Sequence, residues 1–201
     1  VASQTAYVAL IERANIIKGQ TILVLGGTGG VGLAAVQLAN AIGAIVIAVC
    51  SSKAKQKEAI KIGARYAIGY EDMINDVKEI TNQDGVDIIY DPIGGEYFLK
   101  SLKVIKWGGK ILVIGFASGT IPTLPINIAL IKGISVLGVR AGEYFRKNPK
   151  LKKPAMNKLL NIANKGLITP VIHDTLKLKD ASKALKRIEN REVIGRLILK
   201  P

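Results

Sequence analysis

The sequence predicts an α/β fold, a doubly wound parallel sheet with helices on both faces. Short apolar runs rich in Ile and Val alternate with helical segments between residues 21 and 139, and the runs show no polar face. Strands buried on both faces have this pattern, because crossover helices cover a parallel sheet on each side. A glycine-rich turn follows the first run, where such sheets hold ligands.

Six strands are expected from these apolar runs, and glycine, proline or polar segments separate them. The strands cover residues 21–26, 44–50, 64–70, 86–91, 109–116 and 134–139. Small and apolar residues at helical spacing, closing glycines, and acids in a first turn indicate the helices between them. These helices cover residues 31–43, 53–63, 71–81 and 96–106, and a proline-containing loop precedes the sixth strand.

The chain changes character after a charged helix around residues 150–165. A strand-like segment over 169–178, a helix over 180–191 with Asp180 as its N-cap, and a strand over 194–200 follow. This tail does not continue the alternation of strand and helix. We therefore expect one domain over 1–166, opened by a leading helix, and a segment over 167–201 that belongs to another module.

The composition excludes several classes of protein. Apolar residues make up 49% of the chain, so a sizeable core can form. The single cysteine, Cys50, leaves no internal disulfide, and with one histidine, His173, no zinc cage is expected, so no metal site is predicted. No apolar run approaches the roughly 18 residues of a membrane span, and no signal peptide is visible. We expect a cytoplasmic protein without membrane contact.

The formal net charge of +14 raises the question of nucleic-acid binding. The basic residues are mostly lysine and are spread along the chain, with one dense cluster between Arg146 and Lys153. No aromatic residues alternate with them in the way that base stacking requires. Abundant Ile and Lys with scarce Arg suggest a compositional bias, so no specific nucleic-acid partner is predicted.

The turn after the first strand matches G-x-G-x-x-G, and its residues are Gly27, Thr28, Gly29, Gly30, Val31 and Gly32. The motif joins an expected strand to an expected helix, the context that makes it specific for dinucleotides and indicates a Rossmann fold. We expect Gly27 to allow the tight turn, Gly29 to admit the pyrophosphate and Gly32 to let the helix pack closely. Free N–H groups at the helix N-terminus favour the phosphates.

The cofactor is predicted to be NADP(H). Enzymes that prefer NAD carry an acid about 20 residues after the motif, which binds the ribose hydroxyls. Here no acid stands between Gly32 and Glu58, and the segment after the second strand holds two serines and two lysines, including Ser52 and Lys55. Hydroxyl and ammonium groups suit a 2′-phosphate. The alternative is that they are ordinary solvated residues of a lysine-rich chain.

Three segments together resemble the quinone oxidoreductase (zeta-crystallin-like) branch of the medium-chain dehydrogenase/reductase superfamily. They read ILVLGGTGGVGLAAVQLANAIGA, DGVDIIYDPIGG and WGGKILVIGFASGTIPTLPIN. The resemblance implies a branch without the catalytic zinc, in which a barrel-like domain precedes the nucleotide-binding domain. That domain is missing from this sequence, so the tail resembles the returning piece of an incomplete catalytic domain.

The resemblance also implies site residues and assembly. It places Ser52, Lys55 and Arg191 near the cofactor phosphate and Tyr70 near the adenosine. Gly94 is expected close to the cofactor, and the loop holding Phe116 and Ser118 near the nicotinamide. Two subunits are expected to pair the strand over 134–139 in a homodimer, which would cover an otherwise open sheet edge.

Hydride transfer needs no catalytic side chain, because the nicotinamide carries the chemistry. We therefore assign none. His173 is expected at the surface, Asp91 is expected to bind loop backbone, and Cys50 receives no role. The predicted function is an NADPH-dependent reductase of a small acceptor, a quinone or an enone.

Two alternatives remain open. The chain could be a nucleotide-binding module without turnover, a truncated structural relative. It could instead bind RNA, which would require salt-sensitive binding that does not compete with NADPH. Because half of the expected cleft is missing, we expect this chain alone not to sustain efficient quinone reduction.

Overall fold

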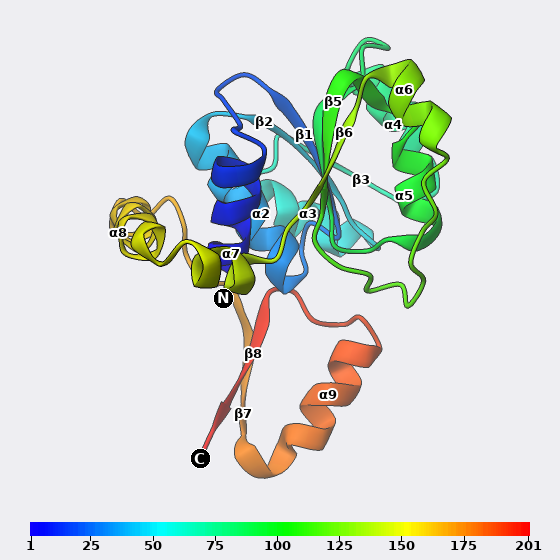
Figure 1. Cartoon of the computed structure of the whole chain (residues 1–201). Helices are drawn as coiled ribbons and strands as arrows, with labels where there is room; N and C mark the ends of the chain where they lie inside the picture. The colour runs from blue at the N-terminus through cyan, green and yellow to red at the C-terminus, as the bar shows by residue number, and fades with distance from the viewer.

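The computed structural model describes residues 1–201 and contains one six-stranded parallel sheet (Figure 1). Its order is β3-β2-β1-β4-β5-β6, so the direction of winding reverses between β1 and β4. The strands are β1 (Thr21–Leu25), β2 (Ile45–Val49), β3 (Tyr66–Ile68), β4 (Val86–Asp91), β5 (Ile105–Val113) and β6 (Ser135–Gly138). The predicted doubly wound sheet is confirmed, and its reversal creates a crevice at the carboxyl ends of β1 and β4.

Helices cover both faces of this sheet. Three lie on one face: α4 (Met73–Ile80), α5 (Gly95–Ser101) and α6 (Ile126–Lys132). The opposite face carries α1 (Ala2–Tyr7), the π-helix η1 (Val8–Arg13), α2 (Gly30–Ile42), α3 (Lys53–Lys61), α7 (Ala141–Lys147) and α8 (Pro149–Asn164). No helix has both the length and the apolarity to cross a bilayer.

The core follows from strand alternation. Along β1, Ile22 and Val24 pack against the α1 and α2 side, while Leu23 and Leu25 pack against the α4 and α5 side. All four side chains are fully buried. Burial of this kind contributes about 1.5–3 kcal/mol for each large aliphatic side chain. The side chains of the apolar strands therefore pack into two separate hydrophobic clusters, one on each face of the sheet.

The helix expected over 96–106 is wrong in its second half. Helix α5 ends at Ser101, and β5 already begins at Ile105. The carbonyl of Val104 accepts a hydrogen bond from the N–H of Val86 (2.9 Å), and β4 and β5 are paired from there on, with one shift of register. The β-branched pair at 104–105 therefore joins the sheet. The structure also contains helix α6, in a stretch for which the sequence predicted a loop.

The tail forms a small unit apart from the main sheet (Figure 1). It contains β7 (Ile172–Lys177), the short 3-10 helix η2 (Leu178–Asp180), α9 (Ala181–Glu189) and β8 (Arg196–Lys200), with β7 and β8 parallel. Asp180 precedes α9, but its carboxylate does not cap the helix and pairs instead with Lys183 (3.0 Å). The division of the chain at residue 166 stays a prediction.

Candidate functional site

The glycine turn is shaped by Gly26 as well as by the motif glycines. Gly26 has a left-handed φ of +64°, and its N–H donates to the hydroxyl of Tyr70 (2.9 Å). A Cβ on Gly27 would lie 2.7 Å from the Cβ of Ala48, so this residue is needed for close approach to β2. Gly27 lies inside the turn, which the Gly29 N–H closes on the carbonyl of Gly26 (2.9 Å), while Gly26 carries the left-handed backbone.

Gly32 holds the helix against the turn. A Cβ at this position would collide with the carbonyl oxygen of Gly26, so only glycine lets α2 start so close to β1. Helix α2 begins after Gly29 with no side-chain cap and no acid in its first turn. Its first N–H groups are therefore free for an anion, which the helix dipole also favours.

Ser52, Lys55 and Arg191 are brought together beside this turn. The hydroxyl of Ser52 caps α3 by accepting the N–H of Lys55 (3.3 Å). The Lys55 ammonium donates to the main-chain carbonyl of Arg191, which lies in the tail and has a φ of +56°. Burial, more than the nearby Arg191 charge, lowers the pKa of Lys55. Residues 136 positions apart thus share one small region.

Thr28 in the glycine turn and Cys50 after β2 are the next two residues of this region. Both are almost fully buried, and the Thr28 hydroxyl lies near enough to the Cys50 thiol to lower the pKa of that thiol. Burial raises the pKa of Cys50 to about 11, although the Thr28 hydroxyl and the Lys55 charge oppose this shift. A thiol of this kind remains protonated near neutral pH and is a poor nucleophile.

Arg196 is a site residue that the sequence reasoning missed. Its guanidinium carbon lies 3.7 Å from the point where a Cβ on Gly30 would stand, at the start of α2. The neighbouring Gly195 N–H donates to the carbonyl of Thr28 (2.9 Å) and holds β8 against the turn. The contact spans most of the chain, and no local signal around an arginine in a final strand predicts it.

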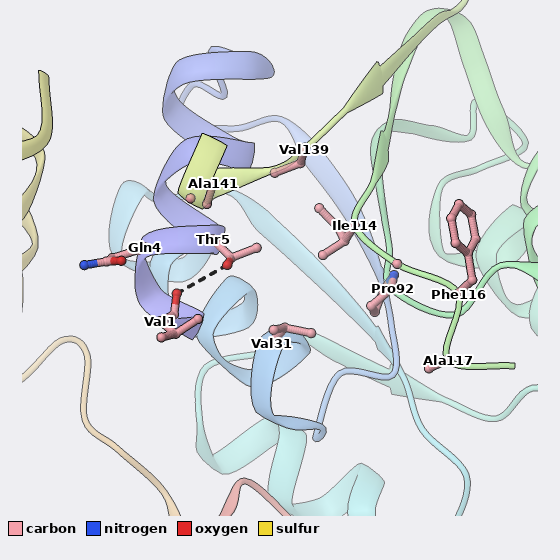
Figure 2. Close-up of a pocket in the computed structure, with 12 residues that line it drawn as sticks. Val1, Gln4, Thr5, Val31, Pro92, Ile114, Phe116, Ala117, Val139 and Ala141 are labelled. Carbon is pink, nitrogen blue, oxygen red and sulfur yellow. Dashed lines mark hydrogen bonds between the residues drawn. The ribbon is translucent and has the colours of Figure 1, made fainter. Parts of the chain in front are cut away.

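A cavity of about 480 Å³ adjoins the turn (Figure 2). Val31, the second residue of α2, forms part of its wall, and Phe116 and Ala117 stand opposite. The remaining lining residues come from α1, from the ends of β4 to β6 and from α7: Val1, Gln4, Thr5, Pro92, Ile114, Gly115, Val139, Ala141 and Gly142. The cavity is mostly apolar, as a site for a flat acceptor and a nicotinamide would be.

The other predicted residues of this edge lie near the cavity without lining it. Gly94 has a φ of +70°, and a Cβ there would come within 2.9 Å of the Phe116 ring. Ser118 is exposed, and its hydroxyl donates to the carbonyl of Thr120 (3.4 Å). Tyr70 packs on Tyr97 with ring centroids 4.3 Å apart.

Asp91 and His173 have the ordinary roles expected from the sequence. One oxygen of Asp91 accepts the N–H groups of Ile93 (2.7 Å) and Gly94 (2.8 Å), which shapes the loop after β4. Burial raises the pKa of Asp91, and these two bonds oppose that shift. His173 is exposed on β7. No group of three or more His, Cys, Asp or Glu side chains is arranged to hold a metal ion.

Known proteins match this chain over nearly its whole length. A quinone oxidoreductase-like protein 2 homolog of Nematostella vectensis is 37% identical over 97% of the chain, which covers 54% of that protein. An acryloyl-coenzyme A reductase of Sulfurisphaera tokodaii is 33% identical over 95% of the chain and 54% of its own length. The chain thus spans a little over half of each of these relatives.

Solved structures agree with the sequence comparison. The crystal structure of Escherichia coli quinone oxidoreductase complexed with NADPH has a TM-score of 0.89 and 28% identity. It is matched by all of this chain, which covers 63% of it. The family model described as zinc-binding dehydrogenase matches residues 30–160, from the start of α2 into α8. The chain therefore belongs to the zinc-binding dehydrogenase family.

Proposed function

We propose that this chain is the cofactor-binding part of an NADPH-dependent oxidoreductase that reduces a quinone or an enone. The observation that carries the proposal is the continuity of the glycine turn with the apolar cavity through Val31. A pyrophosphate on the turn would leave the nicotinamide ring directed to that cavity. The fold supports this placement, since such sheets bind ligands where the winding reverses.

The preference for NADPH rests on Ser52, Lys55 and Arg191. No acid stands among them to bind free ribose hydroxyls, and two of the three are cationic. Their clustering beside the turn suits the extra phosphate, because charge-assisted hydrogen bonds are the stronger ones. Arg196 of β8, whose guanidinium lies beside the start of α2, adds a cation for the pyrophosphate.

The residues present fit such a cofactor, because the glycines leave the turn open and nothing caps α2. Bound NADPH would supply the hydride, so the chain has only to orient the ring, exclude water and admit the acceptor. In an enone, the hydride would bond to the β-carbon and a proton from water to the α-carbon. NADP⁺ and the saturated carbonyl compound would leave.

Titration of the chain with NADPH, followed by an assay with a simple quinone, tests the proposal. We expect micromolar or tighter NADPH binding and turnover well below the ~1–10³ per second typical of enzymes. Weak turnover is expected because the chain spans only 54% of the longer relatives named above. Failure to bind NADPH would refute the proposal. Binding without turnover after addition of a matching barrel domain would favour a non-catalytic module.

We further propose that two chains form a homodimer through residues 134–139. Strand β6 is the edge of the sheet, and Val136 is 40% exposed there. An unpaired apolar edge is a surface that proteins usually cover. We also propose that residues 167–201 belong to a second module and that the protein acts in the cytoplasm, with no nucleic-acid partner.

A further inference from the structure

Residues 194–196, here called the docking segment, join the tail to the glycine turn. The N–H of Gly195 donates to the carbonyl of Thr28 (2.9 Å), and the N–H of Arg196 donates back to the carbonyl of Val171 in the tail (3.1 Å). Gly195 has a left-handed φ of +72°, and a Cβ there would collide with the carbonyl oxygen of Val171. The start of β8 is therefore fixed between the tail and the turn (Figure 1).

The remaining N–H of the docking segment has a side chain as its acceptor. The N–H of Ile194 donates to Nδ1 of His173 on β7 (3.4 Å). The pairing of β7 with β8 shifts register between Ile172 and Asp174, so His173 has no partner residue on β8. An unpaired residue of this kind re-aims a side chain. Here it brings the imidazole to the backbone of the docking segment.

The docking segment also carries Arg196 to the start of α2. The guanidinium carbon of Arg196 and the carbonyl oxygen of Gly195 lie 3.7 Å and 3.6 Å from the point where a Cβ on Gly30 would stand. The first N–H groups of α2 have no side-chain cap and are open to a pyrophosphate. The backbone position of residues 194–196 therefore decides where this cation stands relative to the cofactor phosphates.

Only one of the three acceptors that hold the docking segment can change its charge near neutral pH, and it is the imidazole. A neutral imidazole accepts a hydrogen bond through one nitrogen. In the charged form both nitrogens carry hydrogen, and neither can accept. Protonation of His173 would therefore leave the Ile194 N–H without its acceptor. The carbonyls of Thr28 and Val171 would keep their bonds, so the segment would loosen at one of its three attachments.

The charged groups around His173 favour this response. Asp174, the next residue of β7, lies close enough for its charge to interact with that of the imidazole. The Arg187 guanidinium of α9 pairs with this carboxylate (2.8 Å) and lowers the pKa of Asp174, so the carboxylate stays ionised as pH falls. An imidazolium would therefore have an anion beside it. Between α9 and Leu197 the other charged residues, whose charges stay constant near neutral pH, are Arg191, Glu192 and Arg196.

We propose that His173 is a positioning residue for the cofactor, which in its neutral form holds the docking segment, and with it Arg196, against the glycine turn. This inference rests on the proposed function, because it requires the pyrophosphate to lie on that turn. Protonation of the imidazole would loosen the segment and move the cation away from the phosphates. The affinity for NADPH should therefore fall as pH decreases from 8 to 6, within the range where histidine gains its charge.

NADPH titrations at pH 8 and pH 6 test the inference with two variants. His173→Asn keeps an acceptor oxygen but does not titrate, whereas His173→Leu removes the acceptor. The unchanged chain and H173N should bind alike at pH 8. At pH 6 the unchanged chain should bind roughly threefold more weakly than H173N, as expected for one exposed hydrogen bond. H173L should bind roughly threefold more weakly than H173N at both pH values. The 2′-phosphate of NADPH also titrates in this range, but equally for every variant.

Arg196→Gln tests whether His173 acts through Arg196. In the R196Q background, which lacks the cation, H173L should no longer weaken NADPH binding. An undiminished loss in that background would show a structural role confined to the tail and would overturn the inference. Equal weakening of the unchanged chain and H173N between pH 8 and pH 6 would also overturn it. Both results leave the proposed function intact, whereas an unchanged chain that binds no NADPH at pH 8 would refute the two proposals together.

Discussion

The ammonium group of Lys55 is hydrogen-bonded to the main-chain carbonyl of Arg191, so helix α3 and the tail meet beside the glycine turn. The bond joins residues 136 positions apart. Because Lys55 has several donor hydrogens, it can keep this carbonyl and still face an incoming phosphate. One side chain thus connects the tail to the region proposed for the 2′-phosphate.

Lys55→Ala should weaken NADPH binding and leave NADH binding nearly unchanged. A charge-assisted hydrogen bond is worth about 1.5–3 kcal/mol, a ten- to hundredfold loss of affinity. NADPH fluorescence titrations measure both dissociation constants. Lys57→Ala is the control. Lys57 is an exposed lysine of α3, and it points away from Lys55 because side chains two positions apart on a helix do not face each other. Equal losses for the two cofactors would mean that Lys55 acts only through the tail.

The loss of a hydroxyl should affect stability differently at Tyr90 and at Tyr70. The hydroxyl of Tyr90 is buried and has no hydrogen-bond partner, so Tyr90→Phe should leave the free energy of unfolding unchanged or raise it by about 1 kcal/mol. Tyr70 accepts the Gly26 N–H, and Tyr70→Phe should cost about 0.5–1.5 kcal/mol. Urea unfolding followed by circular dichroism gives both values. Destabilisation by Tyr90→Phe would point to an internal water.

Stability should fall at alkaline pH because of Cys50. Its pKa is about 11 in the folded chain against an ordinary value of 9.0. Between these values the folded chain keeps a proton that the unfolded chain has released, so unfolding becomes easier as pH rises. The loss is at most about 2.7 kcal/mol.

The variant Cys50→Ala separates the alkaline loss of stability caused by Cys50 from any loss caused by tyrosines, which also release protons at high pH. Urea unfolding at pH 8 and pH 10.5 should show a smaller alkaline loss for Cys50→Ala than for the unchanged chain. Identical losses in both proteins would show that Cys50 is accessible and titrates normally.

Val136→Pro should break the proposed dimer while the monomer stays folded. The N–H of Val139 donates inward to Val113 (2.9 Å), and alternation along the strand turns the N–H of Val136 outward. Proline would remove that outward donor. Light scattering in moderate salt, which screens the +14 charge of each chain, measures the mass. Val136→Thr keeps the donor and should remain dimeric, and a monomeric parent chain would contradict the proposal.

Strands buried on both faces were predictable because their residue pattern is local. Val86–Asp91 and Ile45–Val49 appear in the structure close to their expected bounds. The start of β5 was not predictable, because residues 102–106 have helical spacing and only pairing with Val86 decides their conformation. Long-range pairing here overrides a local preference.

The site shows the same division between local and distant information. The glycine motif and the absence of an acid between Gly32 and Glu58 can be read directly from the sequence. The contact of Gly26 with the hydroxyl of Tyr70 could not, because the two residues are 44 positions apart. Arg196 was missed for a similar reason, since the tail reaches Gly30 only through three-dimensional packing.

The bond from the Gly195 N–H to the Thr28 carbonyl has a consequence for the order of folding. Synthesis delivers the glycine turn before the tail. The carbonyl of Thr28 must therefore remain hydrated until residue 195 leaves the ribosome, even when the six-stranded sheet is already complete. Docking of the tail therefore follows formation of the turn, and the finished turn serves as its template.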